Sequence, residues 1–221
     1  MVIGQSDFMS ASYATTQNTL SAPQGIAFDA ERGLWVSDRS NSRVLKFNPL
    51  FSTGMNASLV LGQSEFTSSN WYPPVSPESL ALPAKITFDK AGRLWVLDAE
   101  HRRVLQFSQP FFNYMPATLV LGQADLNSNR GYAVPPAPNT MSYPSSVALD
   151  SEDNVYVGDT YFHRLTKFRA PFSNDMNASI VLGQNDFFSN SGTYDPTNSS
   201  LVSPTEIIIN SQDGALWVAD Y

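Results

Sequence analysis

The two histidines of this 221-residue chain are its first candidates for chemistry, because imidazole binds transition metals and exchanges protons near neutral pH. His101 lies three residues after Asp98, and His163 lies four residues after Asp159. Zinc ligation needs further ligands, and the sequence offers no third histidine. A metal-assisted lyase or hydrolase built on His101 and His163 at the centre of the fold is therefore one hypothesis, and a protein without catalytic chemistry is the favoured one.

Aspartates that recur at one position of a repeated pattern are the second candidates. They are Asp38, Asp98, Asp159 and Asp220. A ring of carboxylates suits a divalent cation, since hard cations prefer carboxylate oxygens. We expect instead that each aspartate accepts backbone N–H bonds in its own turn, because the same residue in every unit indicates a structural role. No cofactor is predicted.

Aromatic residues in the long variable segments are the third candidates. They are Trp71, Tyr72, Tyr132 and Tyr194, in segments 64–82, 124–143 and 185–203. Unlike side chains rich in aromatics are typical of a recognition surface carried on a rigid scaffold. We predict that they form a binding face with His101 and His163, and the alternative is that these segments only wrap over the edges of the sheets.

An internal repeat of about 60 residues must position these side chains. Val-Leu-Gly-Gln occurs at 60–63, 120–123 and 181–184, with Val-Ile-Gly-Gln at 2–5. A second marker, an aromatic residue followed by Val-x-Asp, begins at Trp35, Trp95, Tyr156 and Trp217. Two markers with the same period indicate a true repeat.

Each repeat contains four short apolar segments separated by turn residues, which predicts four β-strands. Such units stack radially because a lone four-stranded sheet cannot bury both faces. We therefore predict an all-β fold, a partial β-propeller of antiparallel blades in a single domain over residues 1–221. The predicted parts are blades at 22–63, 82–123 and 143–184, a last strand of a preceding blade at 1–5, and the first half of a further blade at 203–221.

The aromatic residues of the second marker should lie between blades and supply much of the burial there. They are Trp35, Trp95, Tyr156 and Trp217. An open arc of blades also leaves unpaired edges, which predicts self-association.

The repeat resembles the NHL-repeat family. The first unit carries Pro-x-Gly-Ile-x-Phe-Asp at 23–29, Trp-Val-Ser-Asp at 35–38 and Asn-Ser-Arg-Val at 41–44. The resemblance implies a propeller that serves as a scaffold for unrelated activities. Among its implied activities are a peptidyl-α-hydroxyglycine lyase with histidine metal ligands and RNA binding through a basic face.

The net charge and the amino-acid composition disfavour some of these activities. There are 13 Lys and Arg against 20 Asp and Glu, a net charge of −7, which opposes RNA binding because nucleic-acid affinity depends on cationic side chains. The absence of cysteine excludes disulfides and thiolate sites, and no apolar run approaches a membrane span. The compartment stays open, with an extracellular or cell-surface location slightly favoured over the cytoplasm. The predicted function is a non-enzymatic binding or scaffold module for a protein, peptide or glycan.

Overall fold

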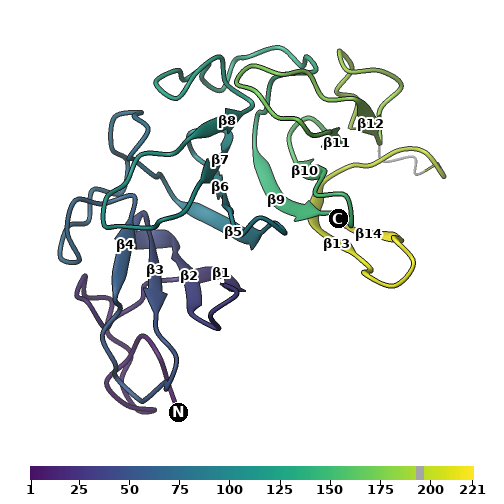
Figure 1. Cartoon of the computed structure of the whole chain (residues 1–221). Helices are drawn as coiled ribbons and strands as arrows, with labels where there is room; N and C mark the ends of the chain where they lie inside the picture. The colour runs from purple at the N-terminus through teal and green to yellow at the C-terminus, as the bar shows by residue number, and fades with distance from the viewer. Residues whose placement is uncertain (193–196) are drawn as a thin grey trace.

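The chain folds as an open arc of antiparallel β-sheets (Figure 1). The computed structural model describes residues 1–192 and 197–221. Three sheets have four strands and a fourth has two, which confirms the predicted all-β partial propeller. The part of the chain that the structure describes contains no helix able to cross a membrane.

Residues 1–192 and 197–221 contain fourteen strands and one short 3-10 helix. They are β1 (Pro23–Phe28), β2 (Leu34–Asp38), η1 (Arg39–Asn41), β3 (Arg43–Phe47), β4 (Leu59–Leu61), β5 (Pro83–Phe88), β6 (Leu94–Asp98), β7 (Arg103–Phe107), β8 (Leu119–Leu121), β9 (Pro144–Leu149), β10 (Val155–Asp159), β11 (Arg164–Phe168), β12 (Ile180–Leu182), β13 (Pro204–Ile209) and β14 (Leu216–Asp220).

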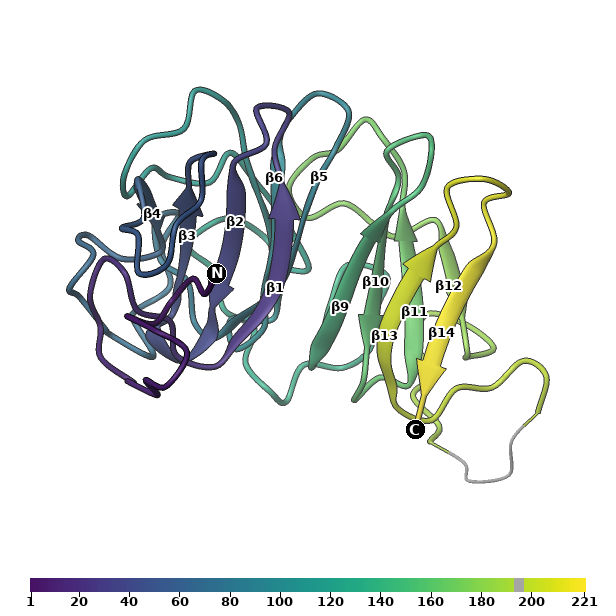
Figure 2. The ribbon, with the colours of Figure 1, turned by 90° about the horizontal axis from the view of Figure 1, so that it is seen from below.

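Strands follow sequence order within each blade, so β1-β2-β3-β4 forms blade 1, β5–β8 blade 2, β9–β12 blade 3 and β13-β14 a half blade. The first strand of each blade contacts the first strand of the next along the inner side of the arc (Figure 2). Because neighbouring strands are antiparallel, the turn between the second and third strands and the link after the fourth strand lie at the same end of a blade. We call this end the link face.

The N-terminal residues differ from their predicted structure. Val2–Gly4 form no strand, although their backbone keeps the position of a fourth strand. The Val2 carbonyl accepts the Gly54 N–H at 3.2 Å, as the Val60 carbonyl of β4 accepts the Tyr114 N–H at 2.9 Å. A fourth strand pairs with the third strand of its own blade, and no such strand lies beside Val2 in the described residues.

Aromatic side chains fill the interfaces between blades. Trp35 is fully buried, and its ring centroid lies 5.7 Å from that of Phe88 and 4.9 Å from that of Phe111, both in blade 2. Trp95 is fully buried as well, and Tyr156 is half-buried. Trp217 was expected between blades, but it is 67% exposed because no further blade among the described residues covers it.

Candidate recognition surface on the second blade

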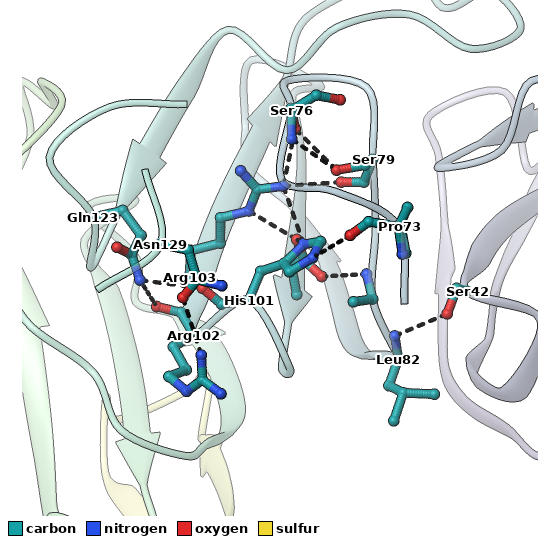
Figure 3. A network of polar contacts seen from close by, with 12 residues as sticks. Ser42, Pro73, Ser76, Ser79, Leu82, His101, Arg102, Arg103, Gln123 and Asn129 are labelled. Atoms are coloured by element: carbon teal, nitrogen blue, oxygen red, sulfur yellow. Dashed lines mark hydrogen bonds and ion pairs between the residues drawn. The ribbon is translucent and has the colours of Figure 1, made fainter. Parts of the chain in front are cut away.

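A buried ion pair in blade 2 holds the segments that form the link face of this blade. Arg103 Nε donates to Asp98 Oδ2 at 2.8 Å, and both side chains are fully buried. Arg103 Nη2 also donates to the carbonyls of Ser76 and Ser79 at 3.0 and 2.9 Å (Figure 3). The pair therefore binds the link before blade 2 to the turn that follows β6.

The groups around Asp98 lower its pKa. Burial alone would raise it, but the Arg103 guanidinium and a hydrogen bond from His101 hold the pKa of Asp98 below its ordinary value. In blade 3 the balance reverses: burial raises the pKa of Asp159, although backbone N–H groups and Arg164 act in the opposite direction. The same repeat position therefore has a lowered pKa in blade 2 and a raised pKa in blade 3.

The recurrent aspartates do accept backbone N–H groups, but the donors are not in their own turn as predicted. The donors lie before the first strand of the same blade, and one from each blade is Ser21, Ala81, Ser142 and Val202. Each aspartate therefore joins the end of its second strand to the incoming link. Among the described residues, Asp159 alone of the four also accepts a backbone N–H of its own turn, from Phe162 at 3.4 Å, whereas Asp38 and Asp98 contact the side chains of Asn41 and His101 there.

His101 is fully buried, and both of its ring nitrogens lie within hydrogen-bonding distance of protein oxygens. Nδ1 lies 3.0 Å from Asp98 Oδ2, and Nε2 lies 3.1 Å from the Pro73 carbonyl (Figure 3). His101 therefore fastens the link segment that carries Trp71 and Tyr72. It is a positioning residue in this structure, whereas the sequence suggested a residue that contacts the ligand.

Trp71 and Tyr72 lie beside the turn between β6 and β7, next to His101. Trp71 is 64% exposed and Tyr72 is 41% exposed, and their ring centroids are 5.8 Å apart. The Tyr72 ring lies 5.6 Å from the His101 ring, and the Trp71 carbonyl accepts Ser42 Oγ at 2.7 Å. The backbone is held in place while both rings face outward.

Tyr132 contacts the same turn through Glu100 and Arg102. Its ring covers the Arg102 guanidinium, with Cζ 3.3 Å from the ring centroid, and its hydroxyl donates to the Glu100 carboxylate. That hydrogen bond and partial burial raise the pKa of Tyr132 above its ordinary value. Arg102 is buried and donates from Nη1 to Asn129 Oδ1 at 3.0 Å. The Tyr132 ring therefore packs on a guanidinium whose position is fixed by this hydrogen bond.

The structure thus brings three predicted residues together around the turn 99–102. We call Trp71, Tyr72 and Tyr132 the aromatic patch. Sequence reasoning missed Glu100 and Arg102, which hold Tyr132 in place. The signal was present, because the corresponding turns, residues 39–42 and 160–163, carry no acidic residue.

The remaining predicted residues lie elsewhere. His163 belongs to the turn of blade 3, where Nδ1 contacts the Val202 carbonyl and the ring packs against Gly192. Tyr194 lies outside the described residues. Within residues 1–192 and 197–221, no group of three or more His, Asp or Glu side chains is placed to hold a metal ion. His101 and His163 are thus not part of a cluster of metal ligands among these residues.

A cavity of about 300 Å³ lies among the innermost strands. Gln24, Lys85, Ser145 and Glu206 are among its lining residues, and Lys85 forms an ion pair with Glu206 across it. Neither histidine lines this cavity. The lyase hypothesis placed both histidines at the centre of the fold, and the structure does not support that placement.

The fold is shared with solved structures of low sequence identity. A virginiamycin B lyase from Staphylococcus aureus is 12% identical with a TM-score of 0.52, over 93% of this chain and 51% of that one. A Bacteroides thetaiotaomicron protein of unknown function is 17% identical with a TM-score of 0.58, over 90% and 45%. Hydrazine synthase of Kuenenia stuttgartiensis is 12% identical with a TM-score of 0.55, over 96% and 45%. The chain spans about half the length of these structures, and at such identities the likeness shows the fold alone.

Fold and repeat together define a partial β-propeller of four-stranded blades. Two of its repeats match the model of the NHL-repeat family, at residues 20–47 and 141–168, which confirms the resemblance. A search of the curated proteins finds no match to this chain.

Proposed function

We propose that this chain is a non-enzymatic binding module that presents the aromatic patch to a protein, peptide or glycan. One observation carries the proposal: three exposed aromatic rings project from backbone that a buried polar network holds in place. Trp and Tyr are the residues that most often dominate binding energy, because they offer a large contact area with few rotatable bonds.

Pre-organisation is the physical advantage of this arrangement. Binding loses affinity for every side chain and loop that must be ordered in the complex. Here Pro73 is tied to His101, and the Trp71 carbonyl is tied to Ser42, before any partner arrives. Tyr132 is likewise held between Glu100 and Arg102. Much of the ordering cost of the patch has therefore been met within the folded chain.

The chemistry around Tyr132 favours a partner that carries hydrogen-bond acceptors. Arg102 Nε and Nη2 are buried and have no hydrogen-bond partner among the described residues. A partner does not contact these covered atoms, but the positive charge of the guanidinium attracts a partner oxygen placed beside Tyr132. Peptide carbonyls, carboxylates and sugar hydroxyls all supply such oxygens, and aromatic faces accept proline rings or sugar rings beside them.

RNA is the weaker alternative, and the patch does not favour it. The chain carries a net charge of −7, and the charged side chains that contact Tyr132 are one acid and one base. Affinity for a polyanion requires a surface with an excess of Lys and Arg.

The test is a screen of immobilised glycans and immobilised peptides with the labelled wild-type chain and three variants. Trp71→Ala and Tyr132→Ala each remove one part of the patch. Phe112→Ala is the matched control, because Phe112 is 55% exposed against 56% for Tyr132 and lies in the loop after β7, at the opposite end of the blade. We expect wild type and Phe112→Ala to capture the same ligands and both patch variants to lose them. Equal capture by all four chains contradicts the proposal.

A further inference from the structure

The outer edge of β14 repeats a geometry that elsewhere pairs with another strand. In the three complete blades the second strand pairs with a third strand that begins with Arg and ends with Phe. In blade 1 Arg43 lies opposite Asp38 and Phe47 lies opposite Leu34. The equivalent residues of β14 are Asp220 and Leu216, and no described strand pairs with its outer edge.

Each of those arginines donates to two backbone carbonyls in blades 1 to 3, and in blades 1 and 2 its Nε also donates to the aspartate at 2.7–2.8 Å. The guanidinium Nη2 donates to two backbone carbonyls of the preceding link at 2.8–3.0 Å. These pairs of carbonyls are Thr16 and Thr19 for Arg43, Ser76 and Ser79 for Arg103, and Ala137 and Thr140 for Arg164.

The half blade carries the same set of acceptors. In every link a backbone N–H donates to a hydroxyl three residues later and shapes the turn, from Thr16 to Thr19 in the first and from Thr197 to Ser200 in the last. Asp220 accepts the N–H groups of Val202 and Ser203, as the other aspartates accept from their links. The Thr197 and Ser200 carbonyls and the Asp220 carboxylate therefore correspond to the three groups that receive the arginine in blades 1 and 2.

An apolar cavity completes the site. About 520 Å³ lies between blade 3 and the half blade, and its apolar lining is Leu165, Val181, Leu182, Leu201, Leu216 and Val218. At the interface of blades 1 and 2, the counterparts of five of these residues belong to one buried cluster, and that cluster also contains Leu105 and Phe107 of β7. The five counterparts are Val44, Leu61, Leu80, Leu94 and Val96. The cavity therefore occupies the place in which a third strand buries its third and fifth side chains.

We propose that the outer edge of β14 binds an extended peptide segment of the pattern Arg-apolar-apolar-polar-Phe as an added antiparallel strand. Its arginine pairs with Asp220 and the Thr197 and Ser200 carbonyls, and its third and fifth side chains enter the apolar cavity. Backbone hydrogen bonds along a free edge supply affinity, while the arginine and the apolar side chains supply specificity. The site is separate from the aromatic patch, and the proposal does not depend on the proposed function.

The test uses a fluorescein-labelled peptide with the sequence of residues 39–48, which includes the third strand of blade 1. Fluorescence anisotropy gives its Kd for the whole chain. Peptides with Arg43→Ala or Phe47→Ala should bind at least about tenfold more weakly, because a charge-assisted contact or a large apolar contact is lost. A peptide with Arg39→Ala is the matched control for net charge and should bind as the parent does.

The protein side of the test compares two substitutions on the β13–β14 hairpin. Asp220→Asn keeps an oxygen for the Val202 N–H but removes the charge, and it should weaken the parent peptide at least about tenfold. Asp213→Asn, at the exposed tip of the same hairpin, should leave the Kd unchanged. Hydrogen exchange should slow in residues 216–220 when the peptide is bound.

Three results overturn the proposal: no saturable binding up to about 1 mM peptide, equal affinity for the Arg43→Ala peptide, or binding without slower exchange in residues 216–220. Reversible self-association that the peptide competes away supports the same site, with a second copy of the chain as the donor of the strand.

Discussion

Trp35 of blade 1 packs edge-on against Phe88 of blade 2, with ring centroids 5.7 Å apart and an interplanar angle of 71°. Its indole Nε1–H donates to Asp29 Oδ2 at 2.8 Å, so the ring is fixed by its own blade before it meets the next one. Trp95 repeats the bond with Asp89 at 2.9 Å. A tryptophan that is hydrogen-bonded within its own blade is therefore the repeated element of the interfaces between blades.

Trp35→Ala should therefore lower the free energy of unfolding by about 3–5 kcal/mol, the usual cost of truncating a fully buried large aromatic side chain. Trp217 occupies the same repeat position but is 67% exposed, so Trp217→Ala should cost less than about 1 kcal/mol. Urea denaturation followed by circular dichroism measures both. Equal losses for the two variants would show that inter-blade packing does not stabilise the arc.

Asp98→Asn should destabilise the chain by about 3–5 kcal/mol, because it leaves the buried Arg103 guanidinium without its counter-charge. Asp220→Asn changes the same repeat position in the half blade, where the side chain is exposed, and should cost less than about 1 kcal/mol. Thermal unfolding of both variants beside wild type checks the difference. A loss below about 1 kcal/mol for Asp98→Asn contradicts this explanation of the link face.

Asp150 should make stability depend on pH in the acid range. Burial acts to raise its pKa, but hydrogen bonds from Asn154 and Lys167 lower the pKa to about 2. Because the folded pKa lies below the unfolded value of 3.8, the carboxylate stabilises the fold above about pH 4, and this contribution is lost as the pH falls toward 2.

Asp150→Asn should accordingly cost about 1–2 kcal/mol at pH 7 and almost nothing at pH 2. Unfolding in urea at a series of pH values measures the difference from wild type. Glu31→Gln is the control, since the Glu31 side chain is 87% exposed and should change stability by less than about 0.5 kcal/mol at either pH. A difference for Asp150→Asn that persists undiminished at pH 2 would exclude the carboxylate as its source.

The repeat made the fold predictable, since two markers with one period define the blade, its strands and the polar turns between them. The N-terminal residues show the limit of that reasoning. Val2–Gly4 have the sequence of a fourth strand, yet a strand forms only where a partner strand supplies hydrogen bonds, and sequence pattern does not report the partner. The exposure of Trp217 has the same origin.

The aromatic patch was predictable in its residues but not in its geometry. Trp71, Tyr72 and Tyr132 were singled out because their links differ between repeats. Two different links carry them to the turn at residues 99–102, where Tyr72 lies beside His101 and Tyr132 lies over Arg102, and this arrangement is a property of the blade stack. The role of His101 could not be read from spacing, because its two partners, Asp98 and the Pro73 carbonyl, come from different segments.

The proposed binding role of the aromatic patch is tested most directly by the Kd of one captured glycan or peptide for wild type, Trp71→Ala and Phe112→Ala. Trp71→Ala should raise the Kd at least about 30-fold, the effect of losing a contact worth about 2 kcal/mol. Its unfolding midpoint should stay that of wild type, because Trp71 is 64% exposed, and Phe112→Ala should bind as wild type does. An unchanged Kd for Trp71→Ala in a folded chain would contradict the claim that this patch is the recognition surface.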